Sequence, residues 1–199
     1  MIAILVAMRS IVAAPVLFGA YGVARILDGL DGSRGPGLAW TVGHLFFLAG
    51  LVLFVQIFGR LRRLAGGGVT ATAGYIAGLV GALSLAAQFT IDIVVGFLSA
   101  DHDAMGPRFD AVRAVPGVEQ VVYTVVPLLF YVGMLVLVAR LAVSRQVPWW
   151  SPALVLVQAV LPLASKDLIP LGAALLLLAF VPLLRARPGV AGTLAPSAF

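Results

Sequence analysis

The chain has 199 residues, of which 62% are hydrophobic and 11% are charged, and its mean hydropathy is +1.11. So little polar surface cannot cover a soluble globule, so the composition excludes a soluble fold and predicts a membrane protein. The net charge of +5 comes from scattered arginines without a nucleic-acid-binding motif, so we expect no nucleic-acid partner. The sequence has no cysteine, which excludes disulfides, thiolate metal sites and cysteine nucleophiles.

Six apolar segments are long enough to be membrane-spanning helices. They cover residues 10–27, 38–59, 71–98, 118–139, 149–164 and 168–184. The predicted fold class is therefore all-α: a polytopic bundle of six transmembrane helices in one domain, 1–188, with a disordered cytoplasmic tail, 189–199. The first segment lacks the positively charged start of a signal peptide, so we interpret it as an uncleaved span, with Met8 as an alternative start to Met1.

Charge separates the two sides of this predicted bundle. Alternate threading of the spans places eight basic residues and no acid on one side, and five basic residues with all eight acids on the other. The positive-inside rule makes the first side cytoplasmic, so six spans put both termini in the cytoplasm. We expect a multi-pass protein of the inner (plasma) membrane, with membrane lipid as one partner.

Within the third span, Asp92 lies about two turns from the outer end, where a lone carboxylate is costly. Ser84, Gln88 and Asp92 share a helical face, which continues inward through Gly74, Gly78 and Gly81. Small residues at this spacing allow close helix packing. Two interpretations of Gln88 and Asp92 stay open: they hold helices together by hydrogen bonds, or they line a cavity in which Asp92 titrates.

Other spans bring polar and aromatic residues to the same outer half. Arg25 is placed to pair with Asp28 or to reach Asp92. Together these residues predict a pocket that opens outward and is closed on the cytoplasmic side by apolar and glycine-rich helix. The candidate substrate-binding residues are Tyr21, Arg25, Asp28, His44, Gln88, Phe89, Tyr123, Phe130, Tyr131 and Gln158.

The Asp101-His102-Asp103 triplet, together with His44, invites a metal-site interpretation. Adjacent residues do not all face one ion without an unusual loop, and no HExxH motif occurs, so we expect no metal and no cofactor. A solvated loop ahead of Pro107 is the expected structure. The Ala65-Gly66-Gly67-Gly68 segment lacks the GK[ST] ending of a phosphate loop and is expected to be a flexible turn.

The pattern as a whole resembles small six-helix membrane proteins common in high-GC bacterial genomes. Residues 43–60, the basic loop before the glycine-rich third span, and Val147-Pro148-Trp149-Trp150 carry this compositional resemblance. More remotely, a compact bundle with buried carboxylates and aromatic residues looks like the integral membrane terpene cyclases. That resemblance implies an enzyme whose acidic side chains protonate an alkene or epoxide of an isoprenoid-type substrate.

Under this hypothesis Asp92 is the catalytic acid and Glu119 its partner. Protonating an isoprenoid requires a carboxylic acid kept neutral in a low-dielectric pocket, and aromatic faces that stabilise the carbocation. Phe89, Phe97, Tyr123, Phe130 and Tyr131 are the candidate aromatic faces. The partner is then a hydrophobic small molecule, which enters laterally if it is made in the cytoplasm.

Two alternatives remain. Six short spans with an outward pocket look similar to the substrate-binding subunits of energy-coupling-factor vitamin transporters, and residues 20–24 supply an AxxxA motif, which implies solute capture or transport. The other alternative is an accessory subunit whose polar groups serve only assembly. The sequence identifies no protein partner for it.

Overall fold

The computed structural model describes residues 2–185, with side chains from Arg9 onward, so the predicted tail at 189–199 lies outside the described residues. The described range is helical and contains no strand. The helices are α1 (Ile2–Asp28), α2 (Leu38–Leu64), α3 (Val69–Leu98), α4 (His102–Arg113), α5 (Leu128–Val143), α6 (Trp150–Ala164) and α7 (Ile169–Phe180). A π-helix, η1 (Glu119–Thr124), and two 3-10 helices, η2 (Lys166–Leu168) and η3 (Val181–Leu184), complete the chain.

All six predicted spans correspond to helical segments. Five are long and apolar enough to cross a membrane: Arg9–Asp28, Leu38–Leu64, Val69–Leu98, Glu119–Val143 and Lys166–Leu184. The remaining span, predicted at 149–164, corresponds to α6. This helix is apolar but has only 15 residues, or about 22 Å, which is less than the thickness of a typical hydrocarbon core. The helical membrane class predicted from composition is therefore supported.

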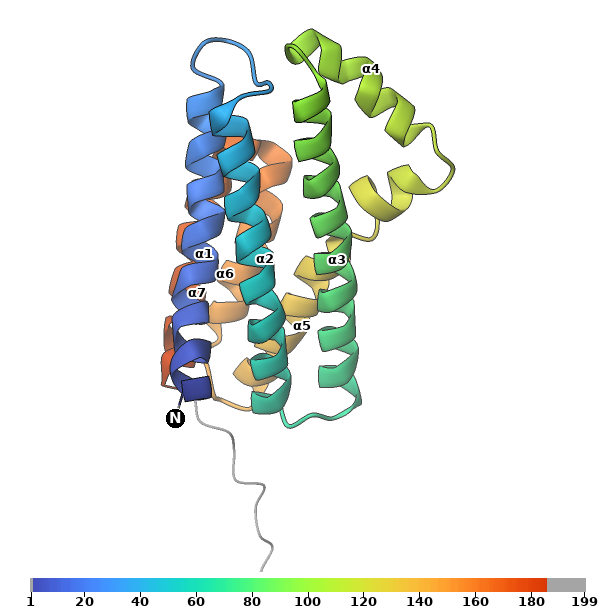
Figure 1. The fold of residues 1–199 in the computed structure, drawn as a ribbon. Coiled ribbons are helices and arrows are strands. Elements are labelled where there is room, and N and C mark those ends of the chain that lie inside the picture. Colours follow the sequence, from blue (N-terminus) through green and yellow to red (C-terminus); the bar gives the residue numbers. More distant parts are fainter. Residues whose placement is uncertain (1, 186–199) are drawn as a thin grey trace, which may run out of the picture.

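Six helices form a closed ring. In the order α1, α2, α3, α5, α6, α7 each packs against the next, and α7 returns to α1. Successive helices run in opposite directions, so α1 begins and η3 ends at the same end of the bundle, the lower end in Figure 1. Large apolar side chains such as Leu83, Leu163 and Val52 are exposed on the outside of the ring, as expected for a lipid-facing surface.

The glycine face predicted on α3 packs directly against α5. A Cβ atom on Gly81 would lie 2.0 Å from the backbone nitrogen of Phe130, and one on Gly133 would lie 2.4 Å from the carbonyl oxygen of Gly74. The helices therefore touch backbone to backbone, which confirms the prediction of close packing. Fully buried phenylalanines fill the interior beside this contact: Phe54, Phe58, Phe130 and Phe180.

Where a solvated loop was expected ahead of Pro107, the chain instead forms the helix α4. The Asp101 side chain caps it by accepting a hydrogen bond from the Ala104 amide at 2.9 Å, and Arg113 lies in its last turn. Both are ordinary helix-end signals, so the prediction of a loop gave too much weight to Pro107. α4 leans away from the ring (Figure 1).

The fourth span is also not the continuous helix predicted for 118–139. It begins with η1, breaks at residues 125–127 and resumes as α5 at Leu128. Pro127 lacks an N–H and its ring clashes with the carbonyl of the residue four positions earlier, so a regular helix cannot pass through it. The Gln120 carbonyl instead accepts from both Val125 and Val126 amides, at 2.9 and 3.1 Å. Glu119 and Tyr123 therefore do not continue the helical face of α5.

Candidate functional site

Asp92 pairs with His44 rather than with Arg25. Asp92 Oδ2 lies 3.6 Å from His44 Nε2, and the two side chains are only 14% and 5% exposed. His44 Nδ1 lies 2.7 Å from the Trp40 carbonyl oxygen, on the opposite side of the ring. The intramembrane carboxylate thus has an ionisable partner on the neighbouring helix, α2, as its cost of burial requires.

The attraction between these two side chains depends on where a proton lies. Because a carbonyl oxygen only accepts, the His44 Nδ1 hydrogen donates to Trp40, and Nε2 of a neutral ring is then an acceptor. An unprotonated Nε2 and a carboxylate would face each other as two acceptors. The contact is attractive only when a proton lies on Nε2 or on the Asp92 carboxyl.

Aromatic side chains surround the pair. The His44 ring lies 4.2 Å from the Trp40 ring, 5.1 Å from Phe89 and 5.6 Å from Tyr21, measured between centroids. Trp40 Nε1 also donates a 3.1 Å hydrogen bond to the Asp92 carbonyl oxygen. Trp40 therefore holds α2 against α3 at the level of the pair.

A cavity of about 160 Å³ lies in the middle of the ring. Every helix of the ring contributes to it, and the polar and aromatic lining includes Phe18, Tyr21, Phe47, Gln88, Phe89, Tyr131, Gln158 and Lys166. Five of the ten candidate substrate-binding residues are among these: Tyr21, Gln88, Phe89, Tyr131 and Gln158. Separate spans therefore place these five residues around one cavity.

The cavity lies beside the Asp92–His44 pair. Gln88 lines it, and Asp92 is one helical turn farther along α3, about 6 Å toward the outer end. Tyr21 forms a shared wall, because it also lines a small void of about 10 Å³ that reaches His44, Arg25 and Asp28. That void is close to the size of one water molecule. Because Tyr21 lines both spaces, its side chain stands between the pair and the cavity.

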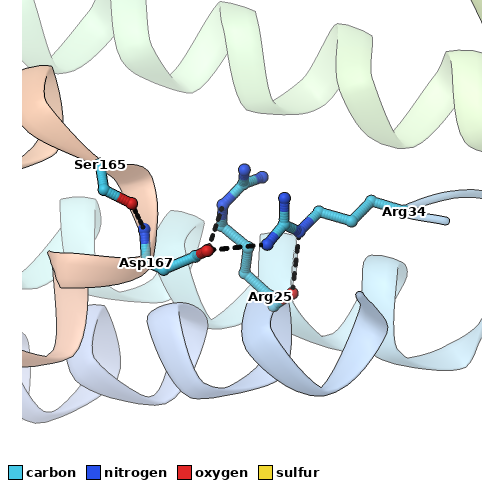
Figure 2. Close-up of polar contacts among 4 residues, drawn as sticks. All are labelled: Arg25, Arg34, Ser165 and Asp167. Carbon is cyan, nitrogen blue, oxygen red and sulfur yellow. Dashed lines mark hydrogen bonds and ion pairs between the residues drawn. The ribbon is translucent and has the colours of Figure 1, made fainter. Parts of the chain in front are cut away.

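Farther out, an open cleft of about 650 Å³ lies between the α1–α2 connection and α4. Arg25 and Arg34 line it, and both point to Asp167 at the α6–α7 turn (Figure 2). Arg34 Nη2 donates to both Asp167 oxygens at 2.8 and 3.0 Å, while Arg25 Nε lies 3.7 Å from Oδ1. The Ser165 hydroxyl oxygen accepts a hydrogen bond from the Asp167 backbone amide, with an N–O distance of 3.2 Å. Arg25 therefore meets neither Asp28 nor Asp92, the two partners expected for it.

Glu119, Tyr123 and Phe130 line neither the central cavity nor the outer cleft. Glu119 is 42% exposed and its carboxylate is 3.6 Å from Arg113 Nε. Arg113 also lies over the Tyr123 ring, and Phe130 packs in the core beside Phe54 and Phe58. Because the π-helix and the Pro127 break remove α-helical spacing, Glu119 is not brought beside Asp92 as a catalytic partner would be.

Several lining residues escaped the sequence reasoning. Phe47 and Phe18 stack at 4.2 Å, and each is three residues from a candidate, His44 or Tyr21, on the same helical face. Helical spacing was sufficient to find them. Lys166 and its neighbour Asp167 lie in the short helix η2, between two spans, where the spacing of apolar residues does not assign a side chain to a helical face.

No group of three His, Asp or Glu side chains within the described part of the chain could hold a metal ion. Asp101 serves as the α4 cap, and the His102 Nδ1 contacts the Arg34 carbonyl oxygen. Comparison with protein-family models, curated proteins and solved structures gives no match.

Proposed function

We propose that the chain is a six-span protein of the bacterial inner membrane with both termini in the cytoplasm. Support comes from the charges at the two ends of the ring. The connections at the end where α1 begins carry arginines and no carboxylate, while the loops and α4 at the other end carry most of the acids. Basic loops remain on the cytoplasmic side during insertion.

Topology reporters test this arrangement. A reporter fused after Phe199, or inserted in the Gly66–Gly68 turn, is expected to read as cytoplasmic, and one inserted after Gly32 as external. The reason is the one-sided arginine bias of the connections. An external signal from the Gly66–Gly68 insertion would contradict the proposed orientation.

We further propose that the central cavity and the Asp92–His44 pair form one acid–base site for a small isoprenoid-type molecule. The observation that carries the proposal is the position of a buried carboxylate–imidazole pair one helical turn from an aromatic cavity lined by all six helices of the ring. Aromatic faces stabilise a carbocation by cation–π attraction. The cavity volume holds one six-membered ring, so a short prenyl compound fits and a folded polyprenyl chain does not.

The proposed step is a proton transfer from the pair to a substrate in the cavity, relayed by a water in the small void beside Tyr21 and His44, because neither Asp92 nor His44 lines the cavity itself. The π electrons of a substrate C=C bond form a new C–H bond with the proton of the pair, and the electron pair of the broken O–H or N–H bond stays on Asp92 or His44. The carbocation then forms a C–C bond with a second C=C bond of the substrate, which closes a ring and moves the positive charge to another carbon. The cation, cyclised or not, finally loses a proton from an adjacent carbon, and this proton returns to the pair. The product has the same mass as the substrate.

Deuterium incorporation tests this step. Purified protein in lipid nanodiscs is incubated in D₂O with the linear C10 and C15 prenyl alcohols geraniol and farnesol. We expect an isomeric product that carries one carbon-bound deuterium after the hydroxyl is exchanged back in H₂O, because the added hydrogen comes from the acid. Absence of carbon-bound deuterium with both alcohols would overturn the acid–base proposal.

The outer cleft favours a second candidate function, solute capture from the external side. Its lining combines the guanidinium groups of Arg25 and Arg34 with the Trp40 and Phe109 rings, which suits a small polar ligand with an apolar part. The inner half of the ring is closed by the α3–α5 backbone contact and by buried phenylalanines, which favours capture over passage through the bundle. Native mass spectrometry of the purified protein would reveal such a polar ligand.

A further inference from the structure

We propose that the central cavity recognises a single-ring molecule that presents a hydrogen-bond acceptor to the Gln158 amide. Gln158 lies on α6, is 6% exposed and lines the cavity. Its Nε2 is buried and has no hydrogen-bond partner within the described residues. An amide donor left unpaired in an apolar interior is costly, and such groups in native proteins are nearly always satisfied. A bound ligand is the partner that the cavity provides room for.

The size of the cavity sets the class of ligand. A cavity of about 150 Å³ lined by apolar side chains is known to bind benzene, so about 160 Å³ suits one ring with a few substituent atoms. The walls are aromatic on α1, α2 and α3: Phe18 stacks on Phe47 at 4.2 Å, and Phe47 on Phe89 at 3.8 Å. Phe47 is thus held between the other two rings, and this rigid stack gives the cavity a preformed apolar wall.

The polar groups of the cavity define where the ligand oxygen lies. Gln158 is deep in the cavity, while Lys166 is exposed and marks its mouth near the α6–α7 turn. A ligand carbonyl, ether or hydroxyl oxygen therefore points to α6, and any further carbons extend toward the mouth. A monocyclic ketone or alcohol has both the single ring and the oxygen acceptor that the cavity requires. A monocyclic alcohol is also the ring-closed isomer of a linear prenyl alcohol, so in naming this ligand as the product the inference rests on the proposed acid–base function.

A matched probe pair tests this recognition in nanodiscs by ¹⁹F NMR. The probes are 4-fluoroacetophenone and 4-fluorocumene, which have the same number of non-hydrogen atoms but differ in the carbonyl acceptor. In Gln158→Met, which keeps side-chain length and loses the donor, binding of 4-fluoroacetophenone is expected to weaken about tenfold. Binding of 4-fluorocumene is expected to change less than about twofold, which also verifies that the variant is folded. Comparing each probe between wild type and variant cancels their different partition into lipid.

Two further variants make the outcome decisive. Gln120→Met, at an exposed position on η1, is expected to bind both probes as wild type does. Gln158→Asn, which retracts the amide, is expected to behave like Gln158→Met. Equal effects of Gln158→Met on the two probes, or no binding of either probe to wild type, would overturn the proposal.

Failure of the ligand site and failure of the acid chemistry are distinguishable. Asp92→Asn is expected to bind both probes with unchanged affinity, because Asp92 lies outside the cavity lining. Probe selectivity without carbon-bound deuterium would leave the ligand site standing and remove the acid chemistry. Carbon-bound deuterium without probe selectivity would do the reverse.

Discussion

Gly81→Ala is expected to destabilise the fold by at least about 3 kcal/mol, the upper part of the usual range for overpacking. The added Cβ would lie 2.0 Å from the Phe130 nitrogen and 2.7 Å from its Cα. Both are backbone atoms, so the contact cannot be relieved by a rotamer change and α3 must move away from α5. The free energy of unfolding in mixed detergent, measured by tryptophan fluorescence or circular dichroism, reports the loss.

Gly106→Ala is the matched control for this substitution. Gly106 lies in α4, and a Cβ there meets nothing within 4 Å. Because alanine is the better helix former, the control is expected to keep or slightly raise stability. Equal stability of Gly81→Ala and wild type would show that the α3–α5 backbone contact is not a feature of the folded protein.

Asp92→Asn is expected to abolish carbon-bound deuterium in the prenyl alcohol assay, a loss of about 10² to 10⁴ in rate. Asparagine keeps the size and hydrogen-bonding capacity of aspartate but has no acidic proton. In the variant, His44 faces an amide in place of the carboxyl group, and an amide has no acidic proton to give to the substrate. The initial rate of deuterium incorporation, measured by mass spectrometry, checks the effect.

Two other acids serve as controls for Asp92. Asp103→Asn changes an exposed residue in the first turn of α4, and Glu119→Gln changes an exposed partner of Arg113. Both variants are expected to retain most of the activity, because neither carboxylate contacts His44 and Glu119 pairs with Arg113 instead. Full activity in Asp92→Asn would make the Asp92–His44 contact structural, and loss of activity in Glu119→Gln would restore Glu119 as the catalytic partner.

Residues on regular helices were placed well by sequence reasoning. Tyr21, Gln88 and Gln158 face one interior because α1, α3 and α6 are continuous at these positions, and helical periodicity assigns each of them to a face. The same argument predicted the glycine contact at Gly81. It did not predict the π-helix that contains Glu119 and Tyr123 or the break at Pro127, where the α-helical period is interrupted.

Partner choice was beyond the sequence. Asp28 is close to Arg25 along the chain, and Asp92 lies on a helix predicted to be its neighbour. Arg25 nevertheless contacts Asp167, which is far away in sequence. This pairing depends on α1 lying against α7, which is decided by how the ring closes. The assignment of His44 to Asp92 depends likewise on the rotation of α2 against α3.

The sequence by itself determined the membrane class, the six apolar helices and the separation of charges between the two ends, because each follows from local hydropathy and spacing. Only the tertiary structure decided that α7 closes the ring onto α1 and that the interior keeps a cavity at the level of Gln158. It also decided that the Asp92 carboxylate lies against His44. The physical reason is that periodicity gives the direction of a side chain from its own helix axis, whereas contacts depend on the rotation, depth and order of helices packed around one another.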